Sequence, residues 1–256
     1  MIVSFVGMSS SVGRRLSTTI PAILGWSRPA RFVVFVLSAT SIWCLLSEFY
    51  GLCEMRLFTF AILIPATAAL ITLAIADRTR GDGLLWRGVV IGAVAGFLAA
   101  CAYDVFRIPF VVAAIDKVGP DWLRLPLFKV FPRFGALILG EPFDPTTTDS
   151  QFTLTAHLVG WVYHFSNGIT FGVMYMALVG DASRRSWWWA VLFATGLELA
   201  MLFTPYTTFF GIHMTTRFVI VTFLAHAIFG VALGLAVKWM SDLWSRRPAK
   251  LAGLST

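Results

Sequence analysis

Six ionisable side chains in this sequence stand inside or beside long apolar segments. They are the four histidines of the chain and two carboxylates, namely His157, His164, His213, His226, Asp104 and Glu198. Ionisable groups are costly in a bilayer, so where they occur they usually face the inside of a helix bundle and mark a site. Judged from the ends of the apolar segments, all six belong to the same half of the membrane. We therefore expect a polar cluster in that half.

The segment from about residue 152 to 178 carries the densest pattern. His157, Trp161, His164 and Tyr175 recur at spacings that place them on one stripe of a helix. Asn167 follows His164 by three residues and so lies beside it on the same helix. A stripe of imidazole, indole, amide and phenol groups favours contact with other helices over contact with lipid.

A metal or haem site is our first interpretation of this cluster. Neutral imidazole is the commonest metal-binding side chain, and the two carboxylates can complete a mixed oxygen and nitrogen site. By depth, His157 pairs with His213 and His164 with His226, as two bis-histidine haems would require. His157 and His164, however, are about 10 Å apart along a helix axis, whereas HExxH-type metal pairs use a spacing of four residues. The working function is a metal- or haem-binding subunit of a larger membrane complex.

Two other functions fit the same residues. Chains of buried Asp, Glu and His relay protons in pumps, and Pro109 and Pro205 would let backbone carbonyls open toward a cavity. That pattern predicts a proton-coupled transporter of a small molecule. Alternatively, Asp104 and Arg107 neutralise each other at a spacing of three, and the histidines hold the bundle in register. The protein would then be a structural subunit without a cofactor.

Sequence motifs do not narrow the chemistry further. The chain has no phosphate-binding GxxxxGK[ST] loop, no GxSxG elbow, no HExxH and no CxxC. No catalytic residue is identified, so the sequence does not decide whether the protein is an enzyme. Lys129 and Arg133 are candidate contacts for lipid headgroups on the outer face.

The elements that must position these residues follow from composition. Hydrophobic residues make up 58% of the 256 residues and charged residues only 13%, against about 25% charged in a typical soluble domain. Most of the surface must therefore face lipid. The net charge of +7 is spread over short runs between apolar segments, which is typical of membrane topology signals and argues against nucleic acid as a partner.

The apolar runs predict an all-α bundle of six transmembrane helices, because a helix needs roughly 20 apolar residues to cross a bilayer. The expected spans are 31–51, 57–76, 88–114, 152–178, 187–203 and 216–240. The long external loop, 115–151, contains an interrupted apolar run, 127–140, that is too short to span. We expect this run to be an interfacial or re-entrant segment.

Lysine and arginine predict the orientation. One side of the six-span arrangement collects Arg14, Arg15, Arg28, Arg31, Arg78, Arg80, Arg87, Arg184, Arg185, Lys238, Arg246, Arg247 and Lys250. By the positive-inside rule that side is cytoplasmic, so both termini are cytoplasmic and the polar cluster belongs to the outer leaflet. We expect an N-terminal segment, 1–30, one membrane domain, 31–240, and a tail, 241–256, in a bacterial inner membrane, with other membrane subunits as partners.

Three Gly-xxx-Gly pairs predict where helices approach closely. They are Gly92 with Gly96, Gly168 with Gly172, and Gly230 with Gly234. Small residues four apart leave a flat stripe on which a second backbone can pack. The pairs favour a compact bundle built around the third, fourth and sixth spans.

Overall fold

The computed structural model describes residues 26–142, 144 and 146–245, and no β-strand occurs in those ranges. The long helices are α1 (Arg28–Phe49), α3 (Ile64–Arg80), α4 (Leu84–Asp116), α6 (Leu154–Val179), α7 (Trp188–Leu202) and α9 (Thr216–Ser245). Shorter elements are α2 (Met55–Phe58), the π-helix η1 (Thr59–Leu63), η2 (Asp121–Leu123), α5 (Val130–Leu139), η3 (Asp149–Gln151), η4 (Ala182–Arg184) and α8 (Tyr206–Phe209). The prediction of an all-α protein is confirmed for the described part of the chain.

Four helical stretches are long and apolar enough to cross a membrane: Arg28–Phe49, Met55–Arg80, Leu84–Asp116 and Thr216–Trp244. The second of these is the continuous run of α2, η1 and α3, in which Pro65 lacks the N–H that a regular helix would use. Helix α7 is shorter, with 15 residues, or about 22 Å. Helix α6 has 26 residues but is not among the four, because histidine, asparagine and hydroxyl side chains interrupt its apolar sequence.

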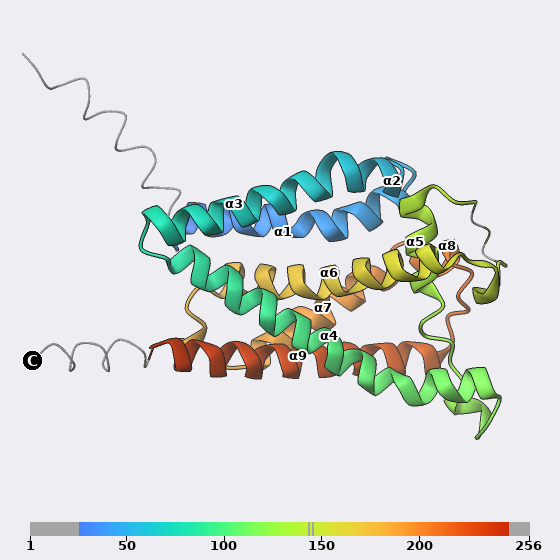
Figure 1. Ribbon diagram of the computed structural model, residues 1–256. Helices are drawn as coiled ribbons and strands as arrows, with labels where there is room; N and C mark the ends of the chain where they lie inside the picture. The colour runs from blue at the N-terminus through green and yellow to red at the C-terminus, as the bar shows by residue number, and fades with distance from the viewer. Residues whose placement is uncertain (1–25, 143, 145, 246–256) are drawn as a thin grey trace, which may run out of the picture.

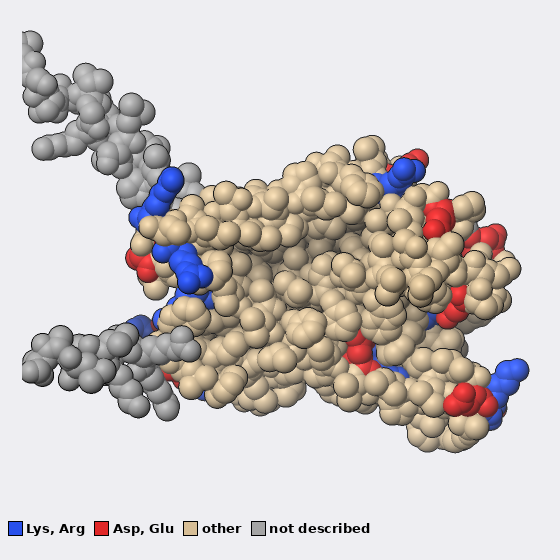
Figure 2. Space-filling view, viewed as in Figure 1, with Lys and Arg blue, Asp and Glu red and all other residues tan. Residues whose placement is uncertain are grey.

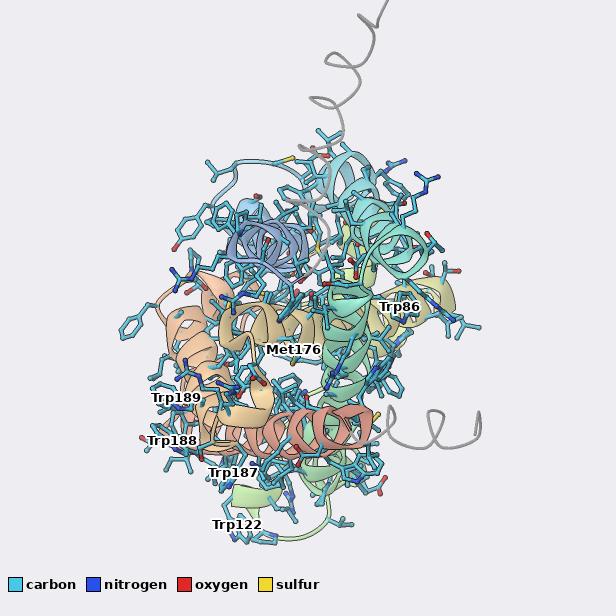
Figure 3. All side chains as sticks on the ribbon, turned by 90° about the vertical axis from the view of Figure 1, so that its left-hand side faces the viewer. Trp86, Trp122, Met176, Trp187, Trp188 and Trp189 are labelled. Carbon is cyan, nitrogen blue, oxygen red and sulfur yellow. The ribbon has the colours of Figure 1, made fainter. Side chains whose placement is uncertain are left out.

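The most polar long helix lies in the middle of the bundle. Viewed along the bundle, α6 with Met176 near the centre is flanked by α1 and α3 on one side and by α7 and α9 on the other (Figure 3). Helix α4 runs obliquely across the bundle beside α6 and α9 (Figure 1). Trp187, Trp188 and Trp189 lie exposed on the periphery of the bundle (Figure 3).

Two rows of close backbone contacts at glycine, which we call glycine seams, join α4 to α6 and α9 to α7. A Cβ atom at Gly96 would overlap the carbonyl oxygen of Gly168, and one at Gly172 would overlap the carbonyl oxygen of Gly92, so α4 and α6 meet backbone to backbone. The third pair serves another helix: a Cβ at Gly230 would lie 2.5 Å from the Cα of Val191 in α7. The glycine pairs therefore lie at close helix contacts, as predicted. These contacts involve α7 in addition to α4, α6 and α9, the three helices that the sequence indicated.

A buried carboxylate fixes the turn between α3 and α4. Asp77 has no exposed surface, and its Oδ2 accepts a hydrogen bond of 3.0 Å from the backbone N–H of Trp86 in the first turn of α4. The positive end of the helix dipole favours a carboxylate there. Gly83 precedes α4 with a φ of 71°, a left-handed conformation that suits glycine. This turn lies at the same end of the bundle as the start of α1 (Figure 1).

The interrupted apolar run of the long loop forms α5, which packs against α6. Phe131, Phe134 and Ala136 are buried. A Cβ at Gly135 would overlap the carbonyl oxygen of Ala156, so the two backbones are in direct contact. Helix α5 is thus covered largely by protein, whereas its placement as an interfacial or re-entrant segment stays a prediction.

Charged residues gather at the two ends of the bundle. Basic side chains dominate the end of the bundle where α1 begins and α9 ends, the opposite end mixes acidic and basic ones, and the surface between is almost entirely uncharged (Figure 2). Most of the expected segments 1–30 and 241–256, with Arg14, Arg15, Arg246, Arg247 and Lys250, lies outside the described residues. Cys44, Cys53 and Cys101 are all free thiols.

Candidate functional site

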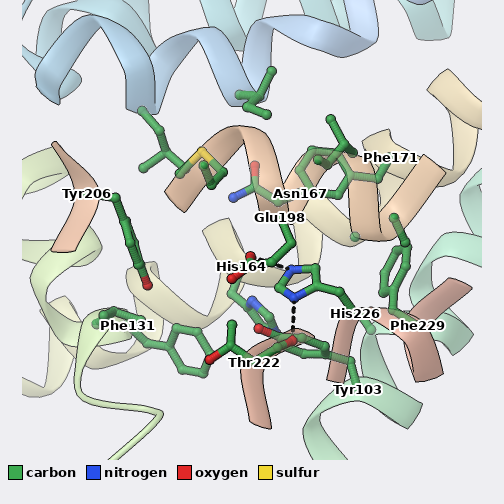
Figure 4. Close-up of a pocket in the computed structure, with 18 of the residues that line it drawn as sticks. Tyr103, Phe131, His164, Asn167, Phe171, Glu198, Tyr206, Thr222, His226 and Phe229 are labelled. Carbon is green, nitrogen blue, oxygen red and sulfur yellow. Dashed lines mark hydrogen bonds and ion pairs between the residues drawn. The ribbon is translucent and has the colours of Figure 1, made fainter. Parts of the chain in front are cut away.

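A cavity of about 130 Å³ lies inside the bundle, between α1, α4, α5 and α6 on one side and α7, α8 and α9 on the other. His164, Glu198 and His226 line it together with Tyr103 and Arg107 (Figure 4). Two histidines and one carboxylate of the predicted cluster therefore share one cavity wall, and Asp104 stands directly behind it through its contact with His164.

The first polar group of the site joins α4 to α6. Nε2 of His164 lies 2.8 Å from Oδ2 of Asp104, and Nη1 of Arg107 lies 3.5 Å from Oδ1 of the same carboxylate. All three side chains are at most 14% exposed. Because Arg107 also donates to the carbonyl of Leu127, it ties α4 to the segment that leads into α5. The carboxylate is thus shared between a permanent cation and a titratable imidazole.

Aromatic rings enclose this group. The Phe131 ring stacks on His164 with centroids 4.3 Å apart, and Trp161 packs on Phe131 at 4.4 Å. The guanidinium of Arg107 lies 4.6 Å from the centre of the Tyr103 ring, a cation–π distance. The rings keep water from this side of the ion pairs, so electrostatic interactions there are stronger than at a surface.

The second polar group joins α7 to α9. Nε2 of His226 lies 3.3 Å from Oε2 of Glu198, and Nδ1 lies 2.9 Å from the carbonyl oxygen of Thr222 (Figure 4). A carbonyl only accepts hydrogen bonds, so Nδ1 carries a proton. Nε2 and the Glu198 carboxylate can then form a hydrogen bond only when one further proton lies between them. This pair therefore has a binding place for one exchangeable proton.

Tyr103 connects the two groups. Its ring centroid is 6.0 Å from that of His164 and 4.9 Å from that of His226. The order Arg107, Asp104, His164, Tyr103, His226 and Glu198 forms a continuous run of polar and aromatic side chains from four helices.

Two buried polar atoms in the cavity wall have no hydrogen-bond partner within the described part of the chain. They are Oδ1 of Asn167 and Oγ1 of Thr222. A buried polar group without a partner costs about 1–3 kcal/mol, and such groups are rare in native proteins. Their position at the cavity favours an occupant, water or a ligand, that supplies the missing hydrogen bonds.

The structure leaves other predicted residues away from this cavity. His157 is half-buried near the start of α6, where its Nε2 lies 3.1 Å from the carbonyl oxygen of Asp149. His213 is exposed in the segment between α8 and α9. Tyr175 is buried and packs on Phe193 at 5.7 Å, further along α6. Trp161 does not line the cavity and packs on Phe128, Phe131 and His164.

The two candidate lipid contacts have different surroundings. Arg133 is 3% exposed and its guanidinium donates to the Thr147 carbonyl and pairs with Asp149 at 3.2 Å, so it ties α5 to the segment before α6. Lys129 is half-buried and donates to the carbonyl of Gly211 at 3.3 Å. Burial, assisted by the charge of Arg133, lowers the pKa of Lys129 from its usual value. A headgroup contact stays a prediction for both, and the geometry favours it for Lys129 alone.

The residues of the cavity do not fit a metal ion. Among the described residues no group of three or more His, Cys, Asp or Glu is arranged to hold one. Both ring nitrogens of His226, and Nε2 of His164, already face oxygen atoms. A haem also exceeds the space, since ligand pockets for molecules of that class occupy roughly 300–1,000 Å³. We therefore derive no chemistry from a metal or a haem.

Sequence reasoning missed Tyr103, Tyr206, Phe131 and Thr222, all of which line the cavity. A signal was present for Tyr103, because it precedes Arg107 by four residues and so shares its helix face. The other three come from α5, α8 and α9, and only the tertiary packing shows that they meet.

Comparison with the models of known protein families, with curated proteins and with solved structures finds no match to this chain.

Proposed function

We propose that the chain is a six-span membrane protein that couples proton binding in its outer half to the movement of a small molecule. Helices α6 and α7 then span the bilayer beside the four stretches that are apolar enough to do so alone. Both termini are cytoplasmic, residues 31–240 form the membrane domain, and the membrane is the inner membrane of a bacterium. The distribution of charge over the two ends of the bundle supports this orientation (Figure 2).

The observation that carries the function is one cavity lined by His164, His226 and Glu198, with each histidine paired to a carboxylate. The His226–Glu198 pair is 3.3 Å long and holds one proton between its two partners. Loss of that proton leaves two lone pairs facing each other, so the distance between α7 and α9 depends on protonation. Movement of the α7–α9 pair relative to α4 and α6 would change the cavity between them, and this is the coupling that a carrier needs.

The closed side of the cavity supports a carrier rather than a channel. Toward the basic end, α4 and α6 meet through Gly92, Gly96, Gly168 and Gly172, with no room for a side chain between them. A solute would therefore reach the cytoplasm only after a rearrangement of the helices, as in alternating access.

A structural role within a larger membrane complex is the second candidate. It is supported by the ion pairs themselves, which link four helices. The unpartnered Asn167 and Thr222 oxygens favour the carrier, because a purely structural bundle gains nothing from leaving them without partners.

The test is a pH step applied to proteoliposomes on a solid-supported membrane. Stepping the outside from about pH 7.5 to about pH 5.5 brackets the titration of histidine. The wild-type protein should give a transient charge displacement that Glu198→Gln reduces at least about tenfold. The matched control is Glu54→Gln, which alters an exposed carboxylate outside the cavity.

Two results would contradict the proposal. A wild-type signal no larger than that of empty liposomes would remove proton binding and leave the structural role. Stoichiometric iron, copper or zinc in the purified protein, lost in His164→Ala, would restore the metal interpretation over the proton site.

A further inference from the structure

A second cavity, of about 250 Å³, lies outward of the first between the outer half of α4, the segment 124–130 and the segment 206–222. Its ionisable lining is basic: Arg107, Arg124, Lys129, Arg217 and His213. No Asp or Glu belongs to the described residues that line it. We call this space the vestibule.

Two of these cations lack an ion-pair partner within the described residues. Arg124 pairs with Asp121 at 3.0 Å and Arg107 with Asp104. Lys129 and Arg217, in contrast, donate only to the backbone carbonyls of Gly211 and Asp121. The vestibule therefore keeps a positive charge of its own, and the low pKa of Lys129 reflects the cost of that charge in a half-buried place.

The vestibule adjoins the inner cavity. The two spaces share five lining residues and are separated by their side chains: Tyr103, Arg107, Val130, Tyr206 and Thr222. The inner cavity is mostly apolar, with Phe131, Phe134, Leu45, Met201 and Phe229 among its walls. Its volume of about 130 Å³ is close to that of the roughly 150 Å³ apolar cavity known to hold benzene.

We propose that the vestibule binds an oxyanion, a carboxylate or phosphate group, carried on an apolar body that enters the inner cavity. Lys129 and Arg217 hold the anionic group, and the aromatic and aliphatic walls hold the body. As the substrate class of a carrier this rests on the proposed function, whereas the binding itself can be measured without it. A ring or branched chain of a few carbons matches the inner cavity. The oxyanion can also be the phosphate of an anionic lipid, which occupies the vestibule alone while its chains stay in the bilayer.

The experiment compares charged and neutral probes of the same shape on the detergent-purified protein at constant pH. Benzoate and benzamide differ by one charge, and inorganic phosphate tests the anionic group alone. Ligand binding to the folded state raises the unfolding temperature. Benzoate should raise it in a saturable way and benzamide should not, with phosphate giving a smaller shift. Added salt should weaken the benzoate effect, because the vestibule opens to solvent.

Variants of the basic residues test whether benzoate binds in the vestibule. Lys129→Gln with Arg217→Gln should weaken benzoate binding at least about tenfold, a loss of about 1.4 kcal/mol. Arg184→Gln removes one exposed cation at the far end of the bundle and should leave benzoate binding unchanged. Native mass spectrometry with phosphatidylglycerol forms the lipid arm. Lipid retained by the wild type and lost by the double variant, without benzoate binding, identifies the source of the oxyanion as a headgroup.

The outcomes separate this inference from the proposed function. Equal shifts with benzoate and benzamide, or no effect of either probe together with no retained lipid, overturn the oxyanion site even if the double variant fails to fold. If the pH step still displaces charge in that case, proton coupling stands without it. Oxyanion binding in a protein that shows no charge displacement removes the carrier and keeps the site.

Discussion

Two buried aspartates in opposite halves of the bundle have different partners. Asp77 accepts a hydrogen bond from the backbone of α4 and caps that helix. Asp104 contacts the side chains of His164 and Arg107, and so joins a titratable group to a cation across two helices. The first arrangement joins a carboxylate to a backbone N–H group, whereas the second joins a carboxylate to an imidazole that can gain or lose a proton.

The packing around them differs in the same way. Between the two aspartates along α4, this helix meets α6 through glycine, without space for a side chain between them. Near Asp104 they diverge around a cavity whose wall contains unpartnered polar atoms. The comparison teaches that the half of the bundle with the glycine contacts provides a rigid frame and the half with Asp104 a polar site, and substitutions can test each half separately.

Removal of the Asp104 charge should have the largest effect. Asp104→Asn leaves Arg107 buried without its counter-ion, and breaking a buried ion pair costs about 3–5 kcal/mol. Thermal unfolding in detergent measures the loss. Asp181→Asn breaks an exposed pair with Arg184 and should cost less than about 1 kcal/mol. Similar losses for both variants would show that Arg107 does not depend on Asp104.

An added methyl group in the glycine seam should rank second. Gly96→Ala places a Cβ against the Gly168 carbonyl oxygen and should destabilise the protein by about 1–3 kcal/mol, because neither backbone can give way. Gly196→Ala is the matched control, since a Cβ there meets nothing within 4 Å. It should stabilise α7 by about 0.5–1 kcal/mol. A harmless Gly96→Ala would contradict the rigid frame.

Removal of an unpartnered hydroxyl should stabilise the protein. Thr222→Val deletes an Oγ1 that has no partner in the described chain, so the unfolding free energy should rise by about 1 kcal/mol. Binding of the benzoate probe should weaken in the same variant. Thr195→Val deletes a hydroxyl that donates to the Val191 carbonyl at 2.7 Å and should destabilise by a similar amount. A loss of stability in Thr222→Val would mean that ordered water already satisfies this oxygen.

The pH dependence of Lys129 should give the smallest effect. Its pKa is lower in the folded than in the unfolded state, so its charge opposes folding fully below the folded-state pKa. That opposition disappears as pH rises toward the unfolded-state pKa of about 10.5. The difference in unfolding temperature between Lys129→Met and wild type should therefore shift in favour of wild type from about pH 7 to about pH 10. A constant difference would show that the lysine is not desolvated.

Much of the fold follows from the sequence because lipid imposes strict rules on composition. The apolar runs located the helices to within a few residues, and the glycine pairs marked two seams. Hydropathy did not show that α6 occupies the centre, although its polar residues are tolerated there because α1, α4 and α5 surround it. The number of spans and the orientation stay predictions.

The sequence predicted several residues of the site but not which of them contact each other. Depth placed Asp104, His164, Glu198 and His226 in one half of the bundle, and the structure brings them into two pairs at one cavity. The expected pairing of His164 with His226 is replaced by carboxylate partners, with Tyr103 between the two rings. Depth alone cannot give the rotation of each helix, which decides the partners.

The central position of α6 has a consequence for biosynthesis. On the proposed topology, a helix with two histidines and an asparagine leaves the ribosome only after α4 has been made, and its own apolarity favours insertion weakly. We expect α6 to enter the bilayer together with α4, with the glycine seam formed while both are still at the translocon. Membrane integration of this segment would then depend on the helix synthesised before it, and a truncated chain that begins after α4 should leave α6 outside the membrane.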